Sequence, residues 1–231
     1  MKVGIIGAME EEVQLLRAQI ENPKVQTIAN CEMIEGTLEG TEVVLVKSGI
    51  GKVNAALATT LLLNTYAPDV VINTGSAGGF GEGLTVGTVV ISDEVTHHDA
   101  DATVFGYVYG QIPQMPETFK SDARLMAVAQ EAVAEIGEHP SAIGLIASAD
   151  TFMADPALVE KTRARFPKMI AAEMEAAAVA QICYQFGTPF VVIRALSDIA
   201  GVESNISFDE FLPVAAKHST EIVLRVLSKL N

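Results

Sequence analysis

Basic residues are few in this 231-residue sequence. Fifteen lysines and arginines stand against 29 aspartates and glutamates, which gives a formal net charge of −14 at pH 7. A nucleic-acid backbone or an anionic membrane surface would be repelled by such a chain. We therefore expect no nucleic-acid and no membrane partner.

Cysteine and long apolar runs are also scarce. Cys31 and Cys183 are the two cysteines, and neither belongs to a CxxC or Cys/His spacing, so the sequence predicts no disulfide and no zinc site. No apolar stretch approaches the roughly 18 to 20 residues of a membrane span. The acidic residues 10–12 interrupt the short N-terminal apolar run, which argues against a signal peptide. These absences predict a soluble cytoplasmic protein.

What the chain does have is a globular balance of residues, with 49% hydrophobic and 19% charged. Its length suffices for one well-buried core, and no repeat, low-complexity tract or linker divides it. We expect a single domain over residues 1–231.

Short apolar runs alternate with segments of helical periodicity. We expect strands at 2–7, 43–47, 70–72, 86–92, 142–147 and 189–195, a hairpin within 26–48, and helices at 9–20, 53–66, 121–136, 156–165, 174–186 and 208–230. This alternation predicts an α/β fold with an open, largely parallel sheet flanked by helices. The irregular segment 97–116 is long enough to predict a functional or contact role.

Ligands bind such sheets where the carboxyl ends of the strands open into loops. Polar residues follow apolar strands within a few positions at Glu12, Ser76, Asp150 and Asp198. Glu12 lies nearest the apolar face of its helix and is expected to point inward, whereas acidic residues in a first turn also simply suit the helix dipole. The first loop lacks the GxGxxG spacing and places acidic residues where a pyrophosphate would bind, so we expect no dinucleotide site.

Other charged residues stand in unusual places. Arg194 and Asp198 leave an otherwise apolar strand, and burying them is costly unless they are paired or used. This is the strongest functional signal that the residues give by themselves. Glu173 and Glu175 precede an alanine-rich helix, where they suit either its N-terminus or the hydroxyls of a sugar. Small residues around Ser76 fit either close approach to a ligand or a tight turn.

The sequence gives little indication of a metal site or of a covalent catalytic intermediate. The neighbouring residues His97, His98, Asp99 and Asp101 could suggest a metal site, but adjacent loop residues rarely make a full ligand set. No GxSxG elbow or other nucleophile motif is present. We expect neither a metal nor a covalent intermediate.

Seven separated motifs resemble the methylthioadenosine/adenosylhomocysteine nucleosidases and occur in that family's order. They are GIIGAMEEE, KSGIGKVNAA, INTGSAGG, the HHDAD to FGY loop, AAEMEAAA, VIRALSD and SFDEFL. The resemblance runs from Met1 to the final helix. It implies a nucleoside phosphorylase-type α/β fold, with a central mixed β-sheet partly closed into a barrel and flanked by α-helices, a homodimer and no cofactor.

The resemblance also implies roles for individual residues. Glu12 would activate the attacking water, which Arg194 and Ser76 help to hold, and Asp198 would protonate adenine N7. An oxocarbenium-like transition state suits this pair, because a carboxylate near the ribose and an acid at the base act on the charges that develop. Burial beside the purine should raise the pKa of Asp198, and a water-facing position should keep Glu12 ionised.

The implied binding residues fall into three groups. The ribose hydroxyls would meet Glu175, the Met174 backbone and Glu173. Adenine would meet Phe152, the Met153 backbone and Ser197. The 5′-alkylthio group would meet Met9, Ile50 and Phe208, with Phe105 and Pro113 of the partner subunit. Ala77 and Gly78 are also expected to bind the substrate, because small residues let the backbone approach it closely. Phe105 and Pro113 would give the long loop a role, although plain dimer packing would explain them equally well.

The sequence departs from the family's pattern at three positions. Ala149 stands where the family often has glycine, Met153 replaces a more usual branched residue, and Ala102 is smaller than expected. Because Met153 would act through its backbone, these departures concern substrate preference, and Ala102 would widen the 5′ pocket.

Three alternatives share the fold or the ligand. A purine nucleoside phosphorylase would need cations at its phosphate site, where this chain has the acidic residues 10–12. An AMP nucleosidase would need a cationic 5′ pocket, whereas Met9, Ile50 and Phe208 are apolar. A nucleoside-binding sensor without turnover would be favoured if Glu12 or Asp198 were missing, and both are present.

Overall fold

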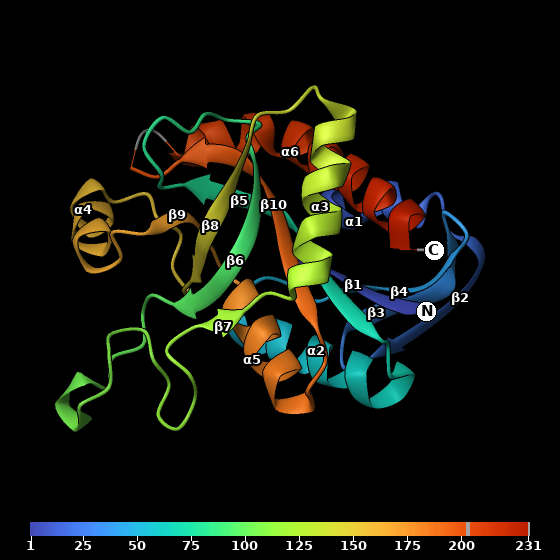
Figure 1. Ribbon diagram of the computed structural model, residues 1–231, viewed down its shortest axis with the longest axis horizontal. Coiled ribbons are helices and arrows are strands. Elements are labelled where there is room, and N and C mark those ends of the chain that lie inside the picture. The colour runs from blue at the N-terminus through green and yellow to red at the C-terminus, as the bar shows by residue number, and fades with distance from the viewer. Residues whose placement is uncertain (202–203, 231) are drawn as a thin grey trace.

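The computed structural model describes residues 1–201 and 204–230 (Figure 1). The described strands are β1 Lys2–Gly7, β2 Glu21–Ile28, β3 Cys31–Leu38, β4 Thr41–Lys47, β5 Val70–Gly79, β6 Val89–His97, β7 Phe119–Lys120, β8 Ser141–Ser148, β9 Met169–Glu173 and β10 Phe190–Ile199. The described helices are α1 Glu10–Arg17, α2 Lys52–Tyr66, the 3-10 helix Thr103–Phe105, α3 Ala123–Ile136, α4 Pro156–Arg165, α5 Ala176–Phe186 and α6 Ser204–Leu230.

Five of these strands close into a barrel. Going round it, β5 pairs with β10, β10 with β6, β6 with β8, β8 with β9, and β9 returns to β5. The β10–β6 and β9–β5 pairs are antiparallel and the other three are parallel. The mixed, partly closed sheet implied by the family resemblance is confirmed.

The open sheet expected from periodicity alone is wrong. The short strand β9, which the sequence did not predict, pairs antiparallel with the last residues of β5 and closes the ring. From β5 the sheet continues outward through β1, β4, β3 and β2, so one part of it is open and the other is a barrel. The hairpin expected within 26–48 is present as β3 and β4, and the additional strand β2 makes residues 21–47 a three-stranded meander.

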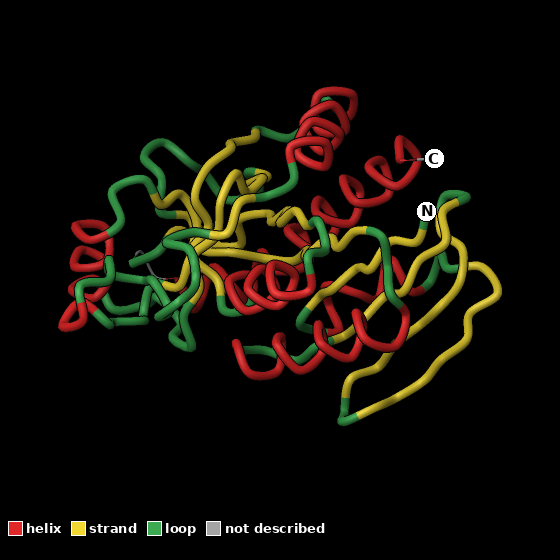
Figure 2. The backbone as a smooth tube through the Cα atoms, turned by 60° about the horizontal axis from the view of Figure 1, so that its bottom comes forward, coloured by secondary structure: helices red, strands yellow, loops and turns green. Residues whose placement is uncertain are grey.

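Helices cover both faces of the open part of the sheet (Figure 2). The strands β1 and β4 are buried on both sides, and their side chains alternate between two cores: Val43 and Leu45 of β4 face α1, α3 and α6, whereas Val44 and Val46 face α2 and α5. This period of two explains why the strands read as continuous apolar runs. Among residues 1–201 and 204–230, no helix is long and apolar enough to cross a membrane.

Two central strands are longer than the sequence suggested. β5 runs on through the small residues to Gly79, and β10 continues to Ile199. Their pairing continues with Ala195 opposite Ser76 and, after a bulge, Asp198 opposite Gly78. Ser76 and Asp198 had been expected to follow their strands, but they lie within β5 and β10. The strands extend this far because closure of the barrel gives their polar segments hydrogen-bonding partners.

The long segment between β6 and β7 is irregular apart from the 3-10 helix and projects from the barrel, at the lower left of Figure 1. Its Phe105 side chain is 80% exposed, and Pro113 is also exposed. Val104 and Val108 are exposed beside Phe105, and a cluster of exposed apolar side chains favours a contact with another molecule.

Candidate active site

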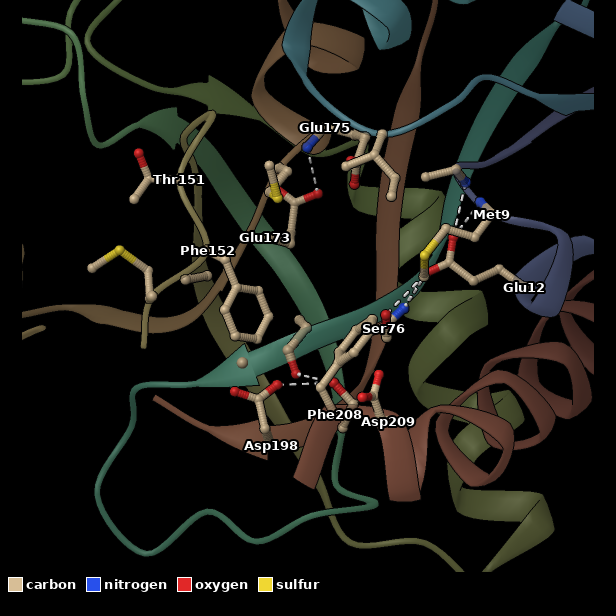
Figure 3. Close-up of a pocket in the computed structure, with 18 residues that line it drawn as sticks. Met9, Glu12, Ser76, Thr151, Phe152, Glu173, Glu175, Asp198, Phe208 and Asp209 are labelled. Atoms are coloured by element: carbon tan, nitrogen blue, oxygen red, sulfur yellow. Dashed lines mark hydrogen bonds between the residues drawn. The ribbon is translucent and has the colours of Figure 1, made fainter. Parts of the chain in front are cut away.

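A cavity of about 340 Å³ opens at one end of the barrel. Its walls come from β5, β9, β10 and the loops that follow β1, β4 and β8, together with α6 (Figure 3). The lining residues are Ala8, Met9, Glu12, Ile50, Ser76, Ala77, Gly78, Thr151, Phe152, Met153, Ala172, Glu173, Met174, Glu175, Ser197, Asp198, Phe208 and Asp209. Segments far apart in the sequence thus converge on one small space.

Glu12 sits in the first turn of α1 and turns inward, as its helical position predicted. Its Oε2 accepts hydrogen bonds from the backbone N–H groups of Ala8 (2.8 Å) and Met9 (3.2 Å). Its Oε1 accepts from the backbone N–H (2.9 Å) and hydroxyl (3.0 Å) of Ser76. Glu12 is 2% exposed and lines the cavity, and donors of the protein hold its carboxylate. The other two acids of that turn, Glu10 and Glu11, are exposed and suit the helix dipole.

Gly75 leaves the room that this arrangement needs. A Cβ at this position would lie 2.5 Å from Glu12 Oε1 and 2.6 Å from Arg194 Nη1, and its φ is +145°. Both neighbours are buried and hydrogen-bonded, so neither can give way cheaply.

Gly75→Ala is therefore expected to lower the free energy of unfolding by about 3 kcal/mol, through overpacking and backbone strain. Gly83→Ala is the matched control, because Gly83 also has a positive φ (+75°), but a Cβ added to it would meet no atom within 4 Å. It should cost about 1 kcal/mol or less. Urea unfolding of the two variants measures both values, and equal losses would show that the crowding beside Glu12 has no energetic weight.

Arg194 is buried behind the cavity and does not line it. The guanidinium donates to Asn73 Oδ1 (2.8 Å), to the Ser76 carbonyl (3.2 Å) and to Glu173, and lies 3.4 Å from Glu175. Its nearest approach to Glu12 is 4.0 Å. Any help that Arg194 gives in holding a water would therefore pass through its neighbours, and the expectation that its buried charge is paired is met.

One guanidinium thus faces three buried carboxylates: Glu12, Glu173 and Glu175. Glu173 also accepts hydrogen bonds from the Ser148 hydroxyl and from the backbone N–H groups at the start of α5, so it serves the helix N-terminus as well. For Glu175, burial and then the nearby Glu173 charge raise the pKa from 4.5 to about 8. Burial and the neighbouring negative charge thus both favour the protonated form of Glu175.

Asp198 of β10 and Phe152 of the loop after β8 line the same cavity (Figure 3). Burial raises the pKa of Asp198 from 3.8 to about 6, although the Ser197 hydroxyl, 2.9 Å from Oδ1, acts in the opposite direction. Gly78 allows this packing, since a Cβ there would lie 3.2 Å from Oδ2. The pKa increase predicted from burial is confirmed, and it places the group near neutrality, where a carboxyl can both hold and release a proton.

Asp198→Asn is expected to stabilise the fold by about 2 kcal/mol at pH 8. The folded state binds the Asp198 proton more tightly than the unfolded chain does, so the wild-type protein loses stability as pH rises from about 4 through about 6. The advantage of the variant should shrink toward zero near pH 4. Urea unfolding from pH 4 to 8 tests this, with the exposed Asp93→Asn as control; a stability difference that did not change with pH would show that the buried Asp198 carboxyl is not its cause.

The remaining walls are largely apolar. Phe152 and Phe208 approach edge to face with ring centroids 5.6 Å apart, and the half-exposed Ile50 and Met9 complete this side. Four lining residues were missed from the sequence: Ala8, Thr151, Ala172 and Asp209. Ala8 and Ala172 carry no chemical signal, whereas Asp209 adjoins the predicted Phe208. Phe105 and Pro113 do not line the cavity of their own chain.

The histidine and aspartate residues at the end of β6 and just after it make other contacts. His97 Nε2 lies 3.0 Å from Gln181, Asp99 pairs with Lys52 at 2.6 Å, and Asp101 accepts from Thr103. Within the described ranges 1–201 and 204–230, no three or more His, Cys, Asp or Glu side chains gather as metal ligands would.

Comparisons with known proteins agree with this geometry. A model of the phosphorylase superfamily matches residues 2–228. Relatives from Lysinibacillus sphaericus (strain C3-41) and Bacillus subtilis (strain 168), both called 5′-methylthioadenosine/S-adenosylhomocysteine nucleosidase, are 67% and 60% identical, and each match covers 100% of both chains.

Solved structures extend the comparison. The nucleosidase of Neisseria meningitidis in complex with methylthio-immucillin-A superposes with a TM-score of 0.97 at 49% identity, over 99% of each chain. The futalosine hydrolase of Helicobacter pylori superposes with a TM-score of 0.93 at 30% identity, over 99% of this chain and 98% of that one. The chain belongs to the phosphorylase superfamily and, within it, to the 5′-methylthioadenosine/S-adenosylhomocysteine nucleosidases, a family of N-glycosyl hydrolases.

Proposed function

We propose that this enzyme cleaves the N-glycosidic bond of 5′-methylthioadenosine, S-adenosylhomocysteine and 5′-deoxyadenosine with water. The products are adenine and methylthioribose, S-ribosylhomocysteine or 5-deoxyribose. One observation carries the proposal: two buried carboxyl groups, Glu12 and Asp198, line one cavity in different hydrogen-bonding environments. The relatives' names and the immucillin complex support the substrate class.

Adenine would lie at the Asp198 end of the cavity. The Phe152 ring offers a stacking surface there, and the carboxyl of Asp198 offers a proton to N7 as the glycosidic bond breaks. A pKa of about 6 suits this step, since the group is partly protonated at neutral pH and still acidic enough to give the proton up. Protonation turns adenine from a poor anionic leaving group into a neutral one.

The ribose would lie between Glu12 and Glu175. A protonated Glu175 can donate to one ribose hydroxyl and accept from the other, which suits a vicinal diol. Glu12 would accept a proton from the attacking water and stabilise the positive charge that grows on the sugar. Ser76 supports this role, because its N–H and hydroxyl fix Oε1.

Arg194 would act through the carboxylates. It holds Glu173 and Glu175 by hydrogen bonds and is therefore a positioning residue for the ribose site. No cofactor is required by these steps.

The 5′ substituent would meet Met9, Ile50 and Phe208, which suit a thioether better than a phosphate. Phe105 and Pro113 of the partner subunit would cover this pocket in a homodimer; the 80% exposure of Phe105 supports that proposal. In this role the enzyme would serve methionine salvage and the recycling of S-adenosylhomocysteine, including autoinducer-2 production, in the cytoplasm.

Adenine release from methylthioadenosine in phosphate-free buffer tests the function. Hydrolysis should proceed at the same rate after phosphate is added. Release that required phosphate would make the protein a phosphorylase, and tight binding without release would make it a sensor. Futalosine serves as the competing substrate, and its faster cleavage would reassign the enzyme to the class of its 30% identical neighbour.

A further inference from the structure

Three residues outside the cavity wall form a closed ring of hydrogen bonds. The backbone N–H of Lys52 donates to Asp150 Oδ1 (2.7 Å), and its ammonium donates to Asp99 Oδ1 (2.6 Å). The ring closes where the backbone N–H of Asp150 donates to Asp99 Oδ2 (3.3 Å). None of the three lines the cavity, and the function proposed above assigns none of them a role.

Each member of this ring belongs to a different segment, and the segments of Lys52 and Asp150 lead to the cavity. Lys52 begins α2 directly after Ile50 and Gly51, Asp150 directly precedes the segment of Phe152 and Met153, and Asp99 begins the projecting segment. Asp99 and Asp150 come together because β6 and β8 are parallel neighbours, with His97 opposite Ser148.

The ring reaches the ribose side through Gly51. The Gly51 N–H donates to Glu175 Oε1 at 2.9 Å, and this residue is held at a φ of +96°. A Cβ on Gly51 would lie 3.0 Å from Asp150 Oδ1, so the carboxylate of Asp150 packs directly against this turn. Moving Asp150 would therefore move both the donor to Glu175 and the segment that carries Phe152.

We propose that Lys52, Asp99 and Asp150 are positioning residues that hold the adenine side and the ribose side of the cavity in a fixed relation. This inference rests on the proposed nucleosidase activity. The substrate contacts both the adenine side and the ribose side of the cavity, so a shift of one side relative to the other misaligns it. Small displacements of binding groups lower the rate of the reaction by large factors. The ring thus acts on the bound substrate through Gly51, Glu175 and Phe152.

The ring should matter more for catalysis than for stability. The Lys52 and Asp99 side chains are 20% and 33% exposed, and ion pairs this accessible to water contribute little to folding. Lys229 provides a matched comparison, because its side chain is also 20% exposed and pairs with Glu131 and Glu135 on another part of the surface.

The first test compares Lys52→Met with Lys229→Met in the full chain, using methylthioadenosine hydrolysis. Lys52→Met should lower kcat/KM about tenfold, with KM raised and kcat lowered, whereas Lys229→Met should stay within about twofold of wild type. Both variants should show similar melting temperatures. Equal kcat/KM values in the two variants would overturn the proposal, and so would a loss that merely follows a lower melting temperature of Lys52→Met.

The second test compares two changes at Asp150. Asparagine keeps an oxygen that accepts from the Lys52 N–H, so Asp150→Asn should retain kcat/KM within about threefold, whereas Asp150→Ala should lose about thirtyfold. Equal losses in the two variants would overturn the ring's role. Failure of the proposed function is recognised separately, because it would appear as absent hydrolysis in the wild-type enzyme and in Lys229→Met.

Discussion

Glu12→Gln is expected to lower kcat for adenine release by about a thousandfold or more. The amide cannot accept a proton from water, and it cannot stabilise positive charge on the ribose; general base catalysis alone contributes about 10²- to 10⁴-fold. The substitution also replaces one carboxylate oxygen with an NH₂ group that faces donors, either those of Ala8 and Met9 or those of Ser76. Steady-state kinetics with methylthioadenosine measures the loss.

Glu11→Gln is the control, since Glu11 occupies the same helical turn, carries the same charge and is exposed. It should leave kcat within about twofold of wild type. Because Glu12→Gln places an amide against buried donors, its stability and its adenine affinity must be measured too. A folded Glu12→Gln enzyme that binds adenine and retains a tenth of the wild-type kcat would exclude Glu12 as the group that activates water.

Asp198→Asn is expected to lower kcat by about 10²- to 10⁴-fold, because asparagine cannot protonate adenine as it departs. The loss should be much smaller for 4-nitrophenyl riboside, whose leaving group departs without protonation. Both substrates present a ribose to Glu12 and Glu175, so the comparison separates acid catalysis from sugar binding. Equal losses for the two substrates would show that Asp198 does not act as the acid for the base.

The same residue sets an expected pH dependence. With an Asp198 pKa of about 6 in the free enzyme, kcat/KM should fall as the pH rises above about 6, because less of the enzyme holds the required proton. This decline should be absent from the residual activity of Asp198→Asn. A wild-type profile that rose through this range would contradict the proposed protonation state.

The candidate site could be predicted from the sequence where a residue stood out against its surroundings. Arg194 and Asp198 interrupt an apolar strand, and Glu12 shares a helical face with apolar residues, so their burial followed from periodicity and charge. What these charges contact could not be predicted, because the partners of Arg194 come from β5 and from the end of β9. Sequence separation hides such pairings.

The barrel was harder to predict than the site. β9 has only five residues, and its alanines give neither a helical nor a strand-like pattern strong enough to stand out. Asp150 was expected at the ligand-binding edge of the sheet, but its hydrogen bonds with Lys52 and Asp99 could not be predicted from the sequence. Both features arise from pairing between distant segments, and only the resemblance to a known family indicated the barrel in advance.

β2 forms a free border of the described sheet, where it pairs with β3 alone. Seven of its eight residues are exposed, and its sequence, ENPKVQTI, places charged residues and a proline along that border. An open strand of this kind could pair with the same strand of another molecule and start an aggregate. Pro23 has no N–H to donate to a neighbouring strand, and the charged side chains of Glu21 and Lys24 would have to be desolvated if another strand paired there. The sequence of this border strand therefore opposes fibre-like association. In the central strands of the described sheet, the backbone N–H and C=O groups are paired with neighbouring strands.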